Sequence, residues 1–72
     1  MNKQDLIEAL EAKKKLCYNR FFEASRRWND NLKLFGDAGH IVVRLDAEKM
    51  VCEDVRIKEI DEFIHMIESL ED

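Results

Sequence analysis

Proline is absent from this chain of 72 residues, and glycine occurs only at Gly36 and Gly39. Few residues therefore interrupt a helix, and a hydrophobic content of 46% is too high for an intrinsically disordered segment. No purely aliphatic run is longer than residues 41–43, whereas a membrane-spanning helix requires roughly 20 apolar residues. We expect one small domain, residues 1–72, that does not enter a membrane.

Cysteine is also scarce. Cys17 and Cys52 lie far apart, without the CxxC spacing of a zinc or redox motif. His40 and His65 likewise lack a second ligand at the short spacing that zinc sites use. The first residues include Asp5 and no apolar segment, so we do not expect a secretory signal peptide. These features predict a cytoplasmic protein with reduced thiols and with neither metal nor cofactor.

Catalytic motifs are missing as well. The chain contains neither the G-x-S-x-G nucleophile motif nor a phosphate-binding P-loop. Glu62 and His65 have the i, i+3 spacing of di-iron helical bundles, but a helical wheel directs both side chains away from the apolar face. A chain of this size also has little material for the walls of a dry active site. We expect a protein that is not an enzyme.

The first half of the chain has the pattern of one long helix, from about residue 5 to residue 35. Its apolar residues recur with the period of an amphipathic helix. Asp5 is the expected N-cap, and Gly36 or Gly39 is suited to end the helix in a left-handed conformation. The apolar stripe comprises Leu6, Leu10, Cys17, Phe21, Ala24, Trp28 and Phe35.

The C-terminal part also has a helical pattern. Its isoleucines are spaced by three, four and three residues, which predicts a helix over about 54–70. Val51 and Val55 fall on the opposite side of that wheel, so we place the start of this helix near Asp54. The isoleucines in question are Ile57, Ile60, Ile64 and Ile67.

Between a loop over 36–40 and this helix lies an ambiguous stretch, residues 41–53. Its first residues are β-branched, and residues 50–52 could pair with them across 46–49, which favours a β-hairpin. A short helix with Asp46 as its N-cap is the alternative. We therefore expect a mostly α fold: a long N-terminal helix, a short hairpin or irregular segment, and a C-terminal helix.

Self-association is the expected completion of this fold. A helix of about 30 residues is roughly 45 Å long, and the expected C-terminal helix is about half that length. Part of the long apolar face is then left uncovered, which predicts a homo-oligomer resembling a helical bundle. Phe22 lies off the main stripe and indicates a second packing surface. The candidate interface residues are Leu16, Phe21, Phe22, Trp28 and Leu34.

Charge is unevenly distributed along the chain. Residues 1–36 carry a net charge of +3 and residues 37–72 a net charge of -7, within a total of -4. Cations recur every seven residues at Lys13, Arg20 and Arg27, and we expect this stripe to face the acidic half of the same or a neighbouring chain. The candidate residues for an inter-chain charge stripe or an anion-binding site are Lys13, Lys14, Tyr18, Arg20, Arg26 and Arg27.

Two functions follow as hypotheses from these patterns. The first is a small regulator or inhibitor that acts through a protein partner, because apolar and charged surfaces are present without catalytic residues. The alternative is an oligomer that binds a nucleotide, a nucleic acid or another phosphate-bearing ligand along the basic flanks of the first helix. The small size and the lack of catalytic motifs would also suit an accessory protein of a phage.

Overall fold

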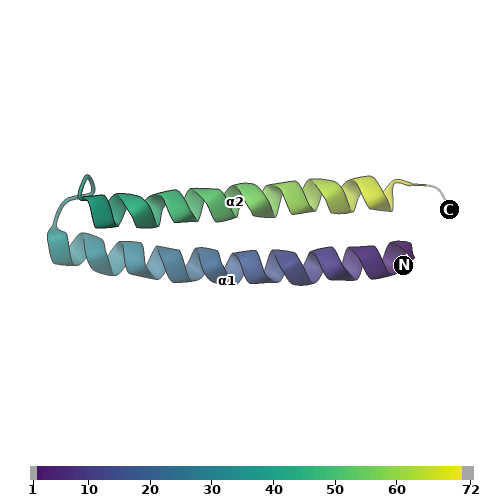
Figure 1. Cartoon of the computed structure of the whole chain (residues 1–72), viewed down its shortest axis with the longest axis horizontal. Coiled ribbons are helices and arrows are strands. Elements are labelled where there is room, and N and C mark those ends of the chain that lie inside the picture. The colour runs from purple at the N-terminus through teal and green to yellow at the C-terminus, as the bar shows by residue number, and fades with distance from the viewer. Residues whose placement is uncertain (1, 71–72) are drawn as a thin grey trace.

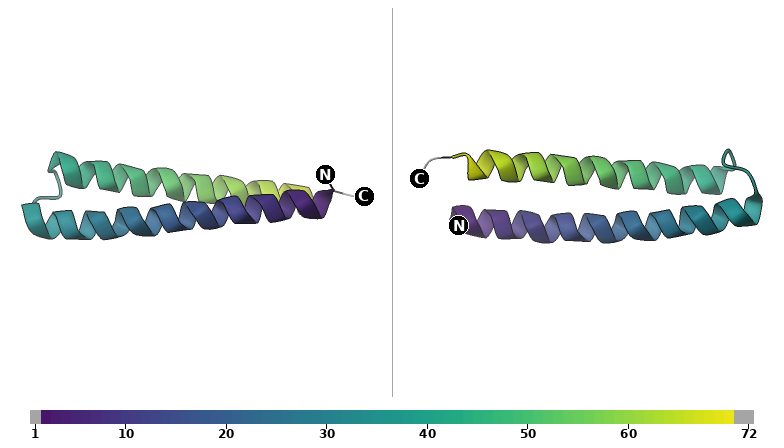
Figure 2. Two further views of the ribbon diagram at one scale, coloured as in Figure 1. Left: turned by 60° about the horizontal axis from the view of Figure 1, so that its bottom comes forward. Right: turned by 180° about the vertical axis from the view of Figure 1, so that it is seen from behind.

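The computed structural model describes residues 2–70 as a hairpin of two antiparallel α-helices, α1 (Lys3–Phe35) and α2 (Ile41–Glu68). The helices lie side by side and give an elongated body of 54 × 15 × 12 Å (Figure 1). Two further directions of view show the same arrangement, with the start of α1 and the end of α2 at one end and the connecting loop at the other (Figure 2). We call these the open end and the loop end.

The expected long N-terminal helix is present, and its C-terminal boundary at Phe35 is confirmed. The predicted N-cap is wrong: Asn2 caps the helix, because its side-chain oxygen accepts a hydrogen bond from the backbone N–H of Asp5 at 2.8 Å. At the other end, Gly36 adopts a left-handed conformation with φ of 67°, and its N–H donates to the carbonyl of Leu32 at 2.8 Å. Glycine is favoured there because other residues rarely adopt positive φ.

The β-hairpin favoured for residues 41–53 is absent, and a single helix begins at Ile41 instead of near Asp54. His40 caps this helix through its Nδ1 atom, which accepts a hydrogen bond from the N–H of Val42 at 3.2 Å. The imidazole ring of His40 also stacks on Phe35, with 3.9 Å between ring centroids and 8° between ring planes. The loop is thereby closed against the end of α1, and α2 starts immediately after it.

The inward-facing positions of α2 explain why the sequence pattern did not predict the first half of this helix. They follow a seven-residue repeat of the kind found in coiled coils, but Asp46 and Glu53 interrupt its apolar pattern. Val51 and Val55 do lie on the outer side of α2, where they are 63% and 46% exposed, yet they belong to the same continuous helix. The repeat consists of Val43, Asp46, Met50, Glu53, Ile57, Ile60, Ile64 and Ile67.

The main apolar core is small and lies in the half of the hairpin nearer the open end. It is formed by Cys17 of α1 with three isoleucines of α2, and Ile7 and Leu10 pack against it. Toward the loop end, Ala24 and Val43 are fully buried, and Asn31 donates a hydrogen bond to Asp46 of α2 at 2.8 Å. The buried isoleucines are Ile57, Ile60 and Ile64.

The expected length mismatch between the helices is wrong. The second helix has 28 residues against 33 in the first, and contacts between them run from the open end to the loop end. Lys3 donates to the carbonyl oxygens of Glu68 and Leu70 at one end, and Arg27 approaches Asp46 toward the other. Any surplus of apolar surface must therefore lie on the sides of the hairpin rather than along an uncovered length of α1.

Candidate functional site

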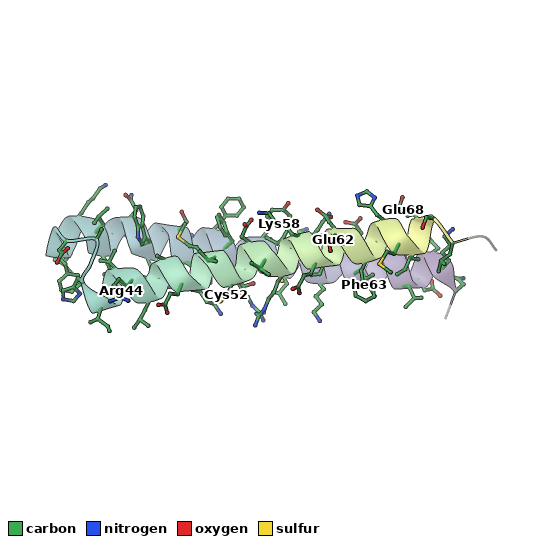
Figure 3. The ribbon with its side chains drawn as sticks, turned by 90° about the horizontal axis from the view of Figure 1, so that it is seen from above. Arg44, Cys52, Lys58, Glu62, Phe63 and Glu68 are labelled. Carbon is green, nitrogen blue, oxygen red and sulfur yellow. The ribbon has the colours of Figure 1, made fainter. Side chains whose placement is uncertain are left out.

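The seam between the helices has two flanks of different chemistry. Side chains immediately before and immediately after an inward position of a helix point to opposite flanks. Figure 3 shows this for α2, where Phe63, which precedes an inward residue, and Lys58, which follows one, project toward opposite edges. Phe63 is therefore on the side of Arg56, and Lys58 is on the side of Val51. We define the basic flank as Lys13, Arg20, Arg27, Lys49 and Arg56. The aromatic flank comprises Tyr18, Phe22, Ala47 and Val51, together with the half-buried inward residues Phe21, Trp28 and Met50 that are open to this side.

The aromatic flank contains an open groove of about 440 Å³ between the helices. Phe21 and Trp28 line it from α1, and Ala47, Met50 and Val51 line it from α2 together with Asp54. The groove is far from covered, since Val51 in its lining is 63% exposed and Phe22, which packs on Phe21 beside it, is 61% exposed.

The ring of Phe22 connects the aromatic side chains into one cluster. It packs edge-on against Phe21, with 5.9 Å between ring centroids, and lies at 6.4 Å from Tyr18 in a stacked arrangement. Both distances lie in the range in which aromatic rings attract one another. The cluster is therefore a preformed apolar surface rather than a set of separate side chains.

The structure brings together three of the five candidate interface residues, Phe21, Phe22 and Trp28. Leu16 lies instead beside the cations of the basic flank. Leu34 is 75% exposed near the loop end and lines neither hollow.

The basic flank contains a second hollow, of about 510 Å³, that is lined by both helices. Sequence reasoning placed Lys13 and Arg20 on a stripe of the first helix and missed Arg56, which completes the hollow from α2. The position of Arg56 in the seven-residue repeat of α2 could have identified it. Lys49 and Arg56 immediately precede inward residues of α2, just as Lys13 and Arg20 do in α1. The hollow is lined by Lys13, Leu16, Cys17, Arg20, Arg56, Glu59 and Ile60.

Two inward-facing acids of α2 neutralise part of this flank. The Arg27 Nε atom lies 3.5 Å from a carboxylate oxygen of Asp46. Glu53 is fully buried, and its Oε1 atom lies 3.2 Å from an Arg56 guanidinium nitrogen and 3.4 Å from Lys49 Nζ. The other oxygen of Glu53, Oε2, is buried and has no hydrogen-bond partner. A carboxylate in this environment keeps an uncompensated desolvation cost.

The remaining candidate cations differ in their surroundings. Arg26 lies with Glu23 and Arg27 around a separate small hollow on the outside of α1. Within the part of the chain that the structure describes, neither Lys13 nor Arg20 forms a salt bridge.

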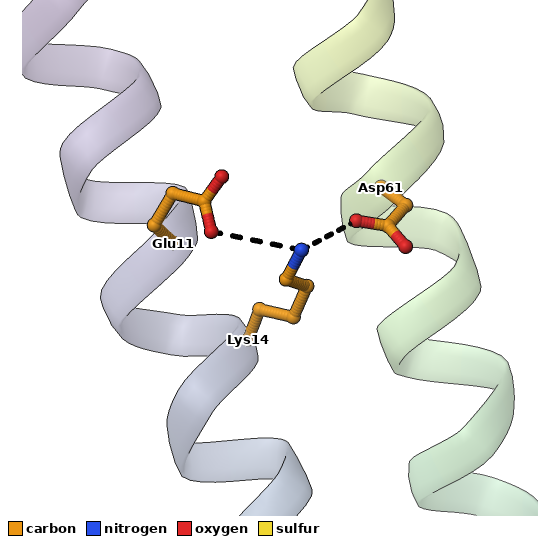
Figure 4. Close-up of polar contacts among 3 residues, drawn as sticks. All are labelled: Glu11, Lys14 and Asp61. Atoms are coloured by element: carbon orange, nitrogen blue, oxygen red, sulfur yellow. Dashed lines mark hydrogen bonds and ion pairs between the residues drawn. The ribbon is translucent and has the colours of Figure 1, made fainter.

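Lys14 faces the seam and bridges the two helices (Figure 4). Its Nζ atom lies 2.7 Å from Asp61 of α2 and 3.6 Å from Glu11 one turn earlier in α1. The hydrogen bond to Asp61, aided by the charges of both carboxylates, raises the pKa of Lys14 above its ordinary value of 10.5. Lys14 is thus held by two carboxylates, and no anion pocket forms around it.

A pH dependence of stability follows from this bridge. Because the pKa of Lys14 is higher in the folded hairpin than in the unfolded chain, its contribution is fully present below pH 10.5 and is lost as the pH rises through the folded-state value. Asp61→Asn should lower the melting temperature at pH 8 and reduce its fall between pH 8 and pH ~11.5. An equal fall in the wild type and the variant would contradict this role of the Lys14–Asp61 pair.

The geometry of the described residues gives less support to thiol chemistry or metal binding. Cys17 is buried, Cys52 is exposed and both are free, while Glu62 and His65 are exposed side chains. Over residues 2–70, no group of three His, Cys, Asp or Glu side chains is arranged to hold a metal ion. Neither helix has an apolar stretch long enough to cross a membrane.

The chain matches no protein-family model, no curated protein and no solved structure.

Proposed function

We propose that this protein is a non-enzymatic interaction protein whose aromatic flank docks a second copy of the same hairpin. The observation that carries the proposal is the preformed aromatic groove, with Phe22 and Val51 both more than 60% exposed beside it. A contiguous apolar surface of this kind on a small protein marks an interaction site. Docking two hairpins through these flanks gives an assembly of four helices.

The small core supports self-association. A chain of about 70 residues buries only roughly 60% of the surface of its unfolded state, and such domains gain stability from association. Here the inward positions also include polar residues, namely Lys14, Asn31, Asp46 and Glu53. A second hairpin would shield Phe21 and Trp28, which are only partly buried in the single chain.

The distribution of charge along the hairpin favours an antiparallel pair. The loop half, residues 20–52, holds six Lys/Arg and five Asp/Glu, a net charge of +1. The open half, residues 3–19 and 53–70, holds six Lys/Arg and nine Asp/Glu, a net charge of -3. A two-fold axis through the middle of the aromatic flank places each loop end over the other copy's open end, whereas parallel packing would bring the two acidic halves together.

Trp28 is the only tryptophan, and its fluorescence reports on the groove directly. In concentrated solution we expect a blue-shifted emission maximum, because the second copy excludes water from the ring. A roughly 1000-fold dilution from high micromolar concentration should shift the maximum to longer wavelength as the copies dissociate. An emission maximum typical of a solvated indole at the highest concentration would contradict the proposal.

A further inference from the structure

The hollow on the basic flank lies within a single chain and does not require self-association. Its cations come from both helices, Lys13 and Arg20 from α1 and Arg56 from α2, and Glu59 is its one carboxylate. Its inner wall is apolar, because Cys17 is 2% exposed and Ile60 is 8% exposed. The hollow therefore combines an apolar base with a polar, mostly cationic rim.

The charges around this hollow are only partly compensated. Arg56 shares the single oxygen Oε1 of Glu53 with Lys49. Arg20 and Lys13 form no salt bridge with any residue between positions 2 and 70. Three cations line the hollow against the single carboxylate of Glu59, so the hollow keeps a net positive charge that attracts an anion.

We propose that this hollow binds the phosphate group of a small phosphorylated molecule that also carries hydroxyl groups, such as a nucleoside monophosphate or a sugar phosphate. Two guanidinium groups can each pair with phosphate oxygens through parallel hydrogen bonds, and the Lys13 ammonium adds further donors. The volume of about 510 Å³ lies in the range of small-molecule sites.

Glu59 selects for the hydroxyl groups. An ionised carboxylate only accepts hydrogen bonds and repels an anion, so a bare phosphate gains nothing from it. A sugar hydroxyl can donate to the Glu59 carboxylate while the phosphate contacts Arg20 and Arg56. The combination of cations and one acid in the same hollow therefore favours a phosphate ester over inorganic phosphate.

A long nucleic acid fits this flank less well. Arg27 would extend the row of cations along α1, but it is already paired with Asp46. Cations seven residues apart on a helix are separated by roughly 10 Å, which leaves isolated positive charges rather than a continuous track. The net charge of -4 also opposes the approach of a polyanion. The positive charge is local to the hollow.

Isothermal titration calorimetry of the full chain tests the site with inorganic phosphate, ribose 5-phosphate and AMP as probes. Both esters should bind more tightly than inorganic phosphate. Equal affinity for the two esters would assign the site to sugar phosphates, and tighter binding of AMP would assign it to nucleotides, whose base can pack on Leu16. Arg20→Gln should weaken the binding of each ester about tenfold or more, since a charged hydrogen-bonding partner is lost.

Arg26→Gln is the matched control, because Arg26 is an exposed arginine of the same helix outside the hollow. It should change the affinity less than about twofold, as expected for a distant surface charge. Arg20 has no carboxylate partner among residues 2–70, so its replacement should leave the helicity measured by circular dichroism unchanged. Glu59→Gln should strengthen the binding of inorganic phosphate and reduce the preference for the esters.

Several results would overturn the proposal. One is the absence of binding for all three probes at ~10 mM, a concentration at which even weak sites fill. Another is an equal loss of affinity in Arg20→Gln and Arg26→Gln, which would indicate diffuse electrostatic attraction. Tighter binding of a single-stranded oligonucleotide than of AMP would reassign the flank to nucleic acid. A monomeric variant of the aromatic flank should still bind the esters, so failure of self-association and failure of this site are separable.

Discussion

Replacing Glu53 with leucine is expected to stabilise the hairpin. Glu53 is fully buried, and its Oε2 atom has no hydrogen-bond partner. Replacing buried ion pairs with apolar side chains of similar volume has stabilised proteins by about 1–4 kcal/mol. The partners of Glu53, Lys49 and Arg56, are 47% and 55% exposed, so their charges stay solvated when the carboxylate is removed. Since ~1 kcal/mol corresponds to roughly 4–8 °C in a domain of this size, the melting temperature should rise by about 4–30 °C. Thermal melts at one fixed protein concentration measure this shift.

Glu62→Leu is the control for this prediction. Glu62 is an exposed glutamate of α2, so the same substitution there should change stability by less than about 0.5 kcal/mol. A melting temperature that falls in Glu53→Leu would show that the contacts of Oε1 with Arg56 and Lys49 outweigh the cost of burying the carboxylate. Glu53 would then be a stabilising residue, contrary to our account.

Glu53 also explains how far the fold could be predicted from the sequence. The first helix was predicted almost to its ends because its apolar residues keep a helical period over its whole length. The second helix was predicted only from about residue 54, because Asp46 and Glu53 occupy inward positions where apolar residues were expected. Local β propensity at residues 41–43 then favoured a hairpin, although packing on α1 determines the helical structure there.

The candidate surfaces were predictable only in part. Residues on one helix could be assigned to a common face, and Phe21, Phe22 and Trp28 do lie together. What the second helix adds to each flank depends on the register of the hairpin, which periodicity alone does not define. Arg56 in the basic hollow and Val51 in the aromatic groove could therefore not be placed beside the residues of α1.

Placing a charge on the aromatic flank is expected to abolish self-association. Phe22 is 61% exposed, so Phe22→Glu should leave the fold of the single hairpin intact while introducing an unpaired carboxylate into the interface. Burying such a charge costs several kcal/mol, which is enough to dissociate a micromolar complex. Val51→Glu makes the same test from the second helix. Leu34→Glu is the control, because Leu34 is exposed outside the groove.

Sedimentation equilibrium of these four proteins tests the central claim most directly. We predict that the wild type and Leu34→Glu sediment at twice the chain mass of 8.6 kDa at ~100 µM, and that Phe22→Glu and Val51→Glu sediment as single helical chains. A wild type that sediments as a single chain at this concentration, or a Phe22→Glu variant that retains the wild-type mass, would contradict docking through the aromatic flank.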